Sequence, residues 1–293
     1  MWENRKASEG KTYGKAWMHR ILVSILRHVH INILYVFSEL FIIPITLITS
    51  TGARLTYSYF HYKRHLGICR SIWNTYQNHI LFGQTVIDKF AMFAGSVFKI
   101  NYHGIEEYRE LTRQKKSFVQ VSAHIGCSEI VGYSYENEKT SNILAFGGEK
   151  ESIMNQRSTL FNSRKINMIP VGIQETHSED IIMAINRGEI VHAFADRIVG
   201  PRKTIYSSLF GNRIKLAKSP FSLAVTRGLE VAMVSAMKES DNTYSAYIKI
   251  LHYDKSLSKR EQCQQLADAY VEEIENLLNK YPLQWFNYSN IWS

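Results

Sequence analysis

The sequence has few cysteines, and the three that it has lie far apart, at Cys69, Cys127 and Cys263. An odd number of isolated cysteines supplies neither a disulfide framework nor the paired spacing of a structural metal site. We therefore expect a reducing compartment and no bound metal. The sequence also lacks a Gly-x-Ser-x-Gly elbow, which argues against a serine hydrolase.

Acidic residues are scarce in residues 1–74, which hold three Asp or Glu against ten Lys or Arg, so this quarter carries +7 of the net charge of +9. Such a block favours an anionic partner, either a nucleic acid or an anionic lipid surface. Within it, residues 29–50 contain no Lys or Arg and are long and apolar enough for a membrane helix. Glu39 and Pro44 argue against a plain span and favour a tilted, kinked or shallow helix. A buried core helix of a soluble domain is the alternative.

The flanks of this apolar run favour lipid over nucleic acid. Residues 53–75 interleave aromatic and cationic side chains, a composition that suits a lipid headgroup layer. The same pattern can stack on bases, but the adjacent membrane-length run makes nucleic acid the weaker reading. No small-residue cleavage site follows the run, so a secretory signal peptide is not indicated. We expect residues 1–95 to form a basic, apolar, membrane-associated helical region.

Residues 96–293 alternate between strand and helix patterns, which is typical of an α/β domain with a mixed sheet flanked by helices. Strands are expected over residues 97–102, 118–121, 143–146, 167–171, 189–194, 204–210, 229–237 and 244–253. Helices are expected over residues 78–98, 106–116, 151–164, 180–187 and 219–228. A final helix should begin at the capping box Ser258-Lys-Arg-Glu261 and stop before Pro282.

His124 follows the predicted strand 118–121 directly, at the sheet edge where ligands bind in open α/β folds. Glu129 lies five residues later, so the two side chains can meet only if His124 is on a loop and Glu129 is on the first helical turn. A carboxylate on one ring nitrogen would make the other nitrogen a general base. The alternative is a strand-end histidine with a backbone hydrogen bond and a solvated Glu129, and spacing alone favours that alternative.

Asp196 and Arg197 follow the predicted strand 189–194 at what should be the same edge. Arg197 could bind a phosphate or a carbonyl oxygen, or form an ion pair with Asp196 that pins a loop. Cys127, three residues from His124, is an alternative nucleophile if the histidine lowers the pKa of its thiol.

Several of these segments, in order, resemble one family. His124-Ile-Gly-Cys-Ser-Glu129 resembles the motif of His, four residues and Asp or Glu in glycerolipid acyltransferases. Asp196-Arg-Ile-Val-Gly-Pro201, Leu209-Phe-Gly211 and residues 219–228 resemble the middle of the bacterial lipid A late acyltransferases, and Tyr281-Pro-Leu-Gln-Trp-Phe286 resembles their C-terminal signature. Leu283 stands where the family has an acid, and no cation follows Lys280, where the family has an Arg-rich tail.

The resemblance implies a glycerolipid acyltransferase-like fold and an O-acyltransferase on the cytoplasmic side of the inner membrane, where it would meet membrane lipid. It implies an acyl thioester co-substrate carried by acyl carrier protein, no bound cofactor, and a lipid or glycolipid acceptor such as a lipid A precursor of lipopolysaccharide. It makes His124 the base and Glu129 its orienting acid. Arg197, held by Asp196, would contact the oxyanion or donor phosphate, with Arg164 and Arg157 as further phosphate-binding candidates.

Other readings stay open at this stage. The family has branches that acylate other lipids or aryl-polyene and flexirubin-type pigments, and the sequence resembles those members too. A non-catalytic membrane protein that keeps the fold and binds lipid is the alternative of a different class. A cysteine-dependent acyltransferase and a nucleic-acid-binding protein are weaker alternatives.

Overall fold

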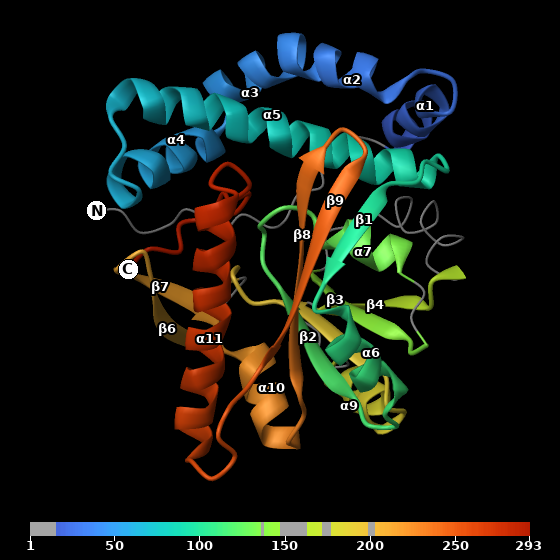
Figure 1. The fold of residues 1–293 in the computed structure, drawn as a ribbon, viewed down its shortest axis with the longest axis vertical. Coiled ribbons are helices and arrows are strands. Elements are labelled where there is room, and N and C mark those ends of the chain that lie inside the picture. Colours follow the sequence, from blue (N-terminus) through green and yellow to red (C-terminus); the bar gives the residue numbers. More distant parts are fainter. Residues whose placement is uncertain (1–15, 136–137, 147–162, 172–176, 199–202) are drawn as a thin grey trace.

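The computed structural model describes residues 16–135, 138–146, 163–171, 177–198 and 203–293. Most of the helix predicted over residues 151–164 lies outside these residues, so that prediction is not tested here. The described residues form a sheet-centred part and a layer of helices beside it (Figure 1).

A seven-stranded mixed sheet has the order β1-β9-β8-β2-β5-β3-β4 (Figure 1). All neighbouring strands are parallel except β8 and β9, which form an antiparallel hairpin. The strands are β1 (Lys99–His103), β2 (Phe118–Ser122), β3 (Ser141–Phe146), β4 (Ile166–Val171), β5 (Ile190–Phe194), β8 (Val231–Ser240) and β9 (Thr243–Leu251). The prediction of an α/β fold with a mixed sheet is confirmed.

The central strands are apolar because they are covered on both faces. Every residue of β2 is buried, as are the first eight residues of β8. Such continuous burial is typical of parallel strands inside an α/β sheet. A separate hairpin of β6 (Thr204–Leu209) and β7 (Asn212–Ala217) packs beside the last helix, and its turn places Phe210 and Gly211 at positive φ.

The helices that accompany the sheet agree with the sequence in type and differ at their ends. They are α6 (Ile105–Arg113), α7 (Ser128–Ser134), α9 (His177–Asn186), α10 (Ser219–Arg227) and α11 (Lys259–Lys280). The predicted capping box at Ser258 and Glu261 is present at the start of α11. The N-cap of α10 is Lys218, whose carbonyl accepts the first helical hydrogen bond, from the N–H of Ser222.

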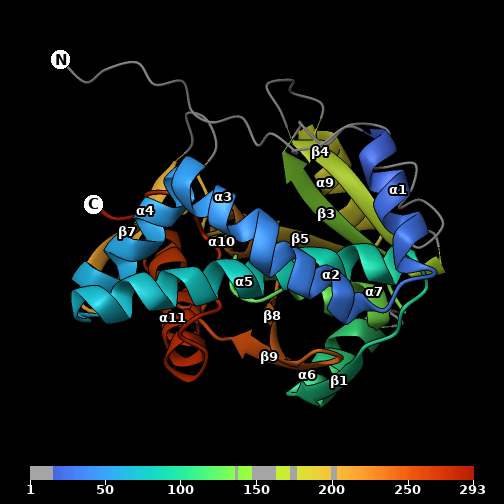
Figure 2. The ribbon, with the colours of Figure 1, turned by 90° about the horizontal axis from the view of Figure 1, so that it is seen from above.

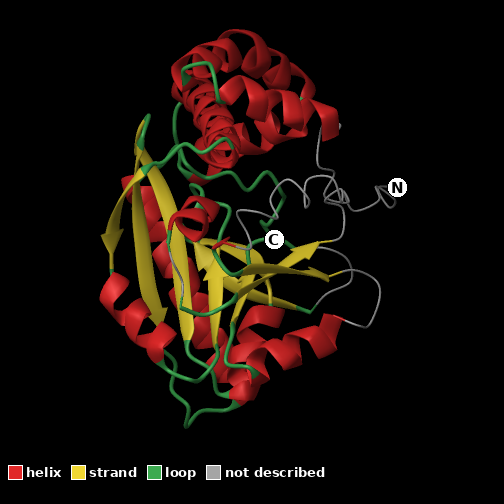
Figure 3. Ribbon diagram, turned by 90° about the vertical axis from the view of Figure 1, so that its right-hand side faces the viewer, coloured by secondary structure: helices red, strands yellow, loops and turns green. Residues whose placement is uncertain are grey.

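The N-terminal residues form a layer of helices across the edge of the sheet at which β2, β5 and β8 end (Figures 1 and 3). The layer contains α1 (Ala16–Leu26), α2 (Ile31–Phe37), α3 (Ile43–Thr49), α4 (Thr51–Ser58) and α5 (Ile68–Phe93), with π-helical turns η1 (Ser38–Ile42) and η2 (Tyr59–Lys63). The helix predicted over 78–98 therefore begins ten residues earlier, at Ile68. The division into regions at residue 95 stays a prediction.

The apolar run forms one continuous helical stretch, Ile31–Thr49, that lies alongside α5 (Figure 2). Only 17% of its most apolar window is buried. Pro44 sits at the start of α3, directly after the π-helical turn η1, so its missing N–H is accommodated there. Gly83 of α5 allows close approach, because a Cβ at that position would lie 3.1 Å from Ser38 Oγ.

A buried polar cluster fastens the layer to the sheet. Lys238 Nζ of β8 lies 2.6 Å from Asp88 Oδ2 of α5, and both side chains are almost completely buried. The hydroxyl groups of Tyr35 in α2 and Tyr244 in β9 also donate to Asp88. The cluster thus joins α2, α5 and the β8–β9 hairpin at one point.

Candidate active site

His124 and Asp196 meet because their strands are neighbours in register. β2 and β5 are parallel, and Ser122 pairs with Phe194. Each residue stands two positions beyond its strand at the same edge of the sheet. His124 Nδ1 lies 2.7 Å from Asp196 Oδ1, and the backbone N–H of His124 donates to Oδ2 at 2.7 Å. One carboxylate therefore fixes both the backbone and the ring of His124.

The dyad combines a buried acid with an accessible base. Asp196 is 2% exposed, whereas the His124 side chain is 26% exposed and its ring packs on Phe194 at 4.7 Å. An acceptor at Nδ1 places the proton of the neutral ring there and leaves the lone pair on Nε2. Among the described residues, Nε2 has no hydrogen-bond partner. The arrangement can therefore receive a proton at Nε2.

The charge on Asp196 is stabilised although the group is buried. Burial raises the pKa of this carboxyl, but the facing His124 ring, the two hydrogen bonds from His124 and the charge of Arg197 outweigh burial and hold the pKa below its usual range. Asp196 is therefore ionised at neutral pH and favours an imidazolium at His124 during a proton transfer.

Glu129 was predicted to contact one ring nitrogen of His124, but the carboxylate that faces Nδ1 is that of Asp196. Gly126, at φ 54°, turns the chain so closely against β8 that an added Cβ would lie 2.0 Å from the carbonyl oxygen of Ala236. After this turn Glu129 begins α7, and its Oε2 lies 2.7 Å from Lys89 Nζ of α5. Spacing along the chain could not show that Glu129 is turned toward Lys89 rather than toward His124. A catalytic role for Glu129 stays a prediction.

Cys127 is not set up as a nucleophile. Its side chain is buried, and burial together with the charge of Glu129 raises the pKa of the thiol to about 12. A thiol with that pKa stays protonated at neutral pH and is a weak nucleophile. These surroundings argue against the cysteine-dependent alternative.

Arg197 lies beside the dyad with unused hydrogen-bonding capacity. Burial lowers the pKa of its guanidinium, although the charge of Asp196 acts in the opposite direction. Nη2 makes a long contact of 3.4 Å to the carbonyl oxygen of Phe286, and the buried Nε has no partner among the described residues. The alternative of a direct Asp196–Arg197 ion pair is not formed among the described residues, although the charge of Arg197 still lowers the pKa of Asp196. The remaining donors suit an anionic ligand.

Of the two other predicted arginines, the structure describes Arg164. Arg164 is described just before β4, and its charge acts on the Tyr102 hydroxyl of β1. Arg157 lies outside the described residues. Substrate binding by either arginine stays a prediction.

The segment Gln284–Tyr288 completes the site, and sequence reasoning assigned it no function. Ile125 and Trp285 form an antiparallel bridge, the N–H of Phe286 donates to the His124 carbonyl at 2.7 Å, and the N–H of Gly126 donates to the Gln284 carbonyl at 2.8 Å. Gly126 also bridges Ala236 of β8. The loop that carries His124 is thus held between β8 and this segment. The C-terminal signature was the only hint in the sequence.

Comparison with known proteins agrees with this geometry. The fold places a carboxylate–imidazole pair that can accept a proton at the edge of an α/β sheet. The sequence model described as bacterial lipid A biosynthesis acyltransferase matches residues 89–293, and the chain belongs to this family. It is therefore a lipid acyltransferase.

The chain was also compared with solved structures and with curated protein sequences. Among solved structures, the 1-acyl-sn-glycerophosphate acyltransferase PlsC from Thermotoga maritima is similar, with a TM-score of 0.40 and 15% identity over 92% of this chain and 99% of that chain. No curated protein sequence matches the chain.

Proposed function

We propose that the protein transfers a fatty acyl group from an acyl thioester, carried by acyl carrier protein, to a hydroxyl of a lipid or glycolipid. The observation that supports this most directly is the His124–Asp196 dyad, with Nε2 of the ring available at the sheet edge beneath the helical layer. The acceptor would be a membrane glycolipid such as a lipid A precursor, or a pigment of the aryl-polyene or flexirubin type.

The reaction follows from the roles of the dyad. Nε2 of His124 removes the proton of the acceptor hydroxyl while the oxygen attacks the thioester carbonyl carbon. Asp196 stabilises the imidazolium that forms. The tetrahedral intermediate then collapses, the carbon–sulfur bond breaks, and the leaving thiolate takes the proton from Nε2. The products are an ester and a free thiol, without an acyl-enzyme intermediate.

Arg197 is the proposed contact for negative charge. Its free donors lie next to the dyad, where the oxyanion develops or where a donor phosphate would lie. Lysine carries the positive charge but lacks the planar set of directed donors that arginine has. Arg197→Lys should therefore retain only part of the activity.

The helical layer would hold the enzyme on the cytoplasmic surface of the inner membrane. The stretch Ile31–Thr49 is apolar enough to cross a bilayer, but on its inner face Tyr35 is hydrogen-bonded to Asp88 of α5 and Ser38 lies close to Gly83 of α5. Crossing would break the buried cluster at Asp88, so an orientation in the plane of the interface is the one we propose. Its outward face is exposed and apolar at Ile33, Val36, Phe37, Leu40, Phe41, Ile42, Ile45 and Ile48, which we call the outer stripe.

The test is acyl transfer by the purified protein in detergent or vesicles with a radiolabelled acyl carrier protein thioester. The His124→Ala variant should lose at least about a thousandfold in kcat while its circular dichroism stays unchanged. Full activity in His124→Ala would reject the base assignment, and lipid binding without transfer by the wild type would favour the non-catalytic alternative. Glu129→Ala, measured beside it, tests the sequence-based role of Glu129.

The acceptor requires a separate experiment. Lipid mass spectrometry of cells lacking the protein should find one species that is short by one acyl chain. The mass of that species distinguishes a glycolipid acceptor from a pigment acceptor.

A further inference from the structure

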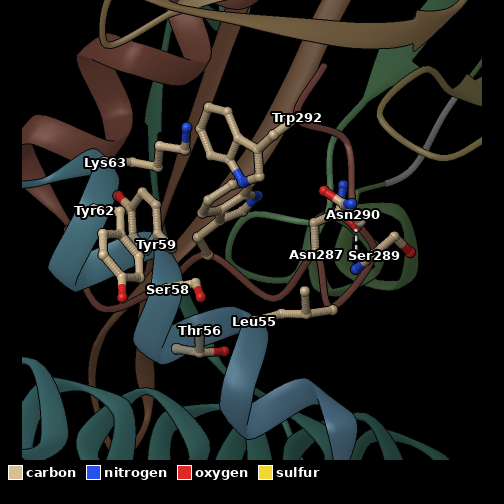
Figure 4. Close-up of a pocket in the computed structure, with 11 residues that line it drawn as sticks. Leu55, Thr56, Ser58, Tyr59, Tyr62, Lys63, Asn287, Ser289, Asn290 and Trp292 are labelled. Atoms are coloured by element: carbon tan, nitrogen blue, oxygen red, sulfur yellow. Dashed lines mark hydrogen bonds between the residues drawn. The ribbon is translucent and has the colours of Figure 1, made fainter.

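Asn287 is the side chain that connects the Gln284–Tyr288 segment to the dyad. Its Nδ2 donates to the Asp196 carbonyl oxygen at 2.7 Å and contacts Asp196 Oδ2 at 3.2 Å. Its Oδ1 accepts the N–H of Ser289 at 3.1 Å, drawn as the dashed line in Figure 4. Because the oxygen is occupied by an N–H donor, the amide must turn its NH₂ group toward Asp196.

These contacts complete the coordination of a buried charge. Asp196 Oδ2 receives the N–H of His124 and the NH₂ of Asn287, whereas Oδ1 faces His124 Nδ1. Asn287 is 6% exposed, so no water readily replaces its donor. Without that donor the carboxylate can rotate, and Oδ1 no longer has a fixed position relative to the ring.

The backbone of Asn287 is independently fixed. Asn78 of α5 donates to the carbonyl oxygens of Leu283 and Trp285, each at 2.8 Å, and accepts the hydroxyl of Tyr288 at 3.0 Å. Gln284 makes two hydrogen bonds to the backbone of Lys238. Because the backbone is fixed on both sides of Asn287, its side chain can set the position of the Asp196 carboxylate.

We propose that Asn287 is a positioning residue that locks the Asp196 carboxylate, and through it the Nδ1–H tautomer of His124, in the form that leaves Nε2 as the base. The proposal rests on the proposed acyl transfer for its kinetic consequence. It rests on the geometry alone for its effect on the ring.

The neighbouring pocket supplies a matched control. A pocket of about 320 Å³ is lined by residues of α4 and η2 and by the C-terminal residues, with Asn287 and Asn290 both on its wall (Figure 4). Asn290 is exposed, and no contact joins it to Asp196. Asn290→Leu therefore makes the same side-chain change on the same wall without touching the dyad.

Kinetics give the first readout. A hydrogen bond to a charged group contributes enough that Asn287→Leu should lower kcat roughly 10- to 100-fold, with KM changed by less than about twofold. Asn287→Asp, which sets a second carboxylate against Asp196, should lower kcat further. Asn290→Leu should stay within about twofold of the wild type in kcat. A change confined to KM would overturn the proposal.

The tautomer of His124 gives a second readout that does not depend on the reaction. The protein is labelled with ¹⁵N in the rings of its 11 histidines, and the His124 signals are those missing from His124→Gln. Long-range ¹H–¹⁵N spectra should show the Nδ1–H form in the wild type and in Asn290→Leu, and a mixture of tautomers in Asn287→Leu.

The outcomes are separable. If the folded Asn287→Leu protein shows the same His124 tautomer as the wild type, the positioning role is overturned. This holds also when the activity of the variant falls, as long as the fall only matches the loss of folded protein. A changed tautomer in Asn287→Leu together with no acyl transfer by the wild type would support the role of Asn287 and reject the proposed function.

Discussion

His124 is held at two points, its backbone N–H and its ring Nδ1, by the two oxygens of one carboxylate. This arrangement fixes the plane of the imidazole as well as its tautomer. It also makes the site sensitive to the identity of the acid, because only an acceptor at Nδ1 leaves the lone pair on Nε2.

Asp196→Asn should therefore cost more than the loss of one hydrogen bond. The amide can turn its NH₂ toward Nδ1, which then becomes an acceptor and leaves the proton on Nε2. We expect kcat to fall by about 10³- to 10⁴-fold with the fold intact, as for the analogous change in a serine protease triad. Steady-state kinetics and the ¹⁵N spectra of His124 measure this together. A fall of less than about tenfold would mean that Asp196 does not orient the base.

A second histidine, His192, makes the stability of the protein depend on pH. His192 of β5 is buried and its Nε2 lies 2.9 Å from Ser122 Oγ. Burial lowers its pKa from 6.5 to about 4, although the charge of Glu129 acts in the opposite direction. The unfolded chain thus binds a proton between pH 6.5 and 4 that the folded protein does not, so stability falls as the pH falls through that window.

The size of this effect can be isolated with His192→Gln. Between pH 7 and pH 4, the free energy of unfolding of the wild type should fall by roughly 3 kcal/mol more than that of the variant. Urea denaturation at several pH values measures both slopes. Parallel curves for the two proteins would contradict the burial of a neutral His192.

At the scale of elements, the helical layer is joined to the sheet by buried charge rather than by apolar packing alone. Lys238 and Asp88 are 3% and 0% exposed in their side chains. Removal of one partner leaves the other group buried without its opposite charge.

Lys238→Met should therefore lower the free energy of unfolding by about 3–5 kcal/mol. The matched control is Lys249→Met at an exposed lysine, which breaks the pair with Glu273 and should cost less than about 1 kcal/mol. Denaturant melts give both values, and hydrogen exchange should show faster exchange in α2 of Lys238→Met. Equal effects of the two substitutions would show that the cluster does not fasten the layer.

The outer stripe is the surface of the layer that we propose contacts lipid. Phe41 and Ile45 are 59% and 64% exposed, and neither contributes to the core. Phe41→Ser with Ile45→Ser should weaken partitioning into lipid vesicles by tenfold or more, because about 1.5–3 kcal/mol accompanies full burial of each side chain. Ile182→Ser, a partly exposed residue on α9, is the control (Figure 1). Vesicle flotation measures binding, and unaltered binding of the double variant would exclude the stripe as the lipid-contacting surface.

For the molecule as a whole, the sequence predicted local structure better than it predicted contacts. Alternating patterns located the strands, and Ser258 with Glu261 located the start of α11. The pairing of β1 with β9 and of Ile125 with Trp285 joins segments more than 140 residues apart, and no local pattern encodes such pairs.

The site was predicted only in part, because its contacts also depend on pairing between distant segments. Strand ends indicated that His124 and Asp196 share one edge of the sheet, but register decides which carboxylate reaches the ring. The pairing of Ser122 with Phe194 selects Asp196, and the turn at Gly126 carries Glu129 to Lys89. Asn287 lies one residue beyond a segment that only family resemblance marked.

The charge distribution makes a prediction for the whole protein. The net charge is +9, and most of the excess lies in the quarter of the chain that contains the apolar stretch. Binding to vesicles with anionic lipid should weaken as salt rises from 0.05 to about 0.5 M, because the Debye length shortens severalfold. Sedimentation with anionic and zwitterionic vesicles measures this. Identical binding to both at low salt would show that charge does not contribute.

The position of Asn287 in the chain has a consequence for how the enzyme matures. A ribosome produces His124 and Asp196 well before the strand-like residues that brace them, so a nascent chain carries the reactive groups without their support. The proposed chemistry at the histidine therefore has to wait until Asn287 has been synthesised, by which time the apolar helices have already been made and can have reached lipid.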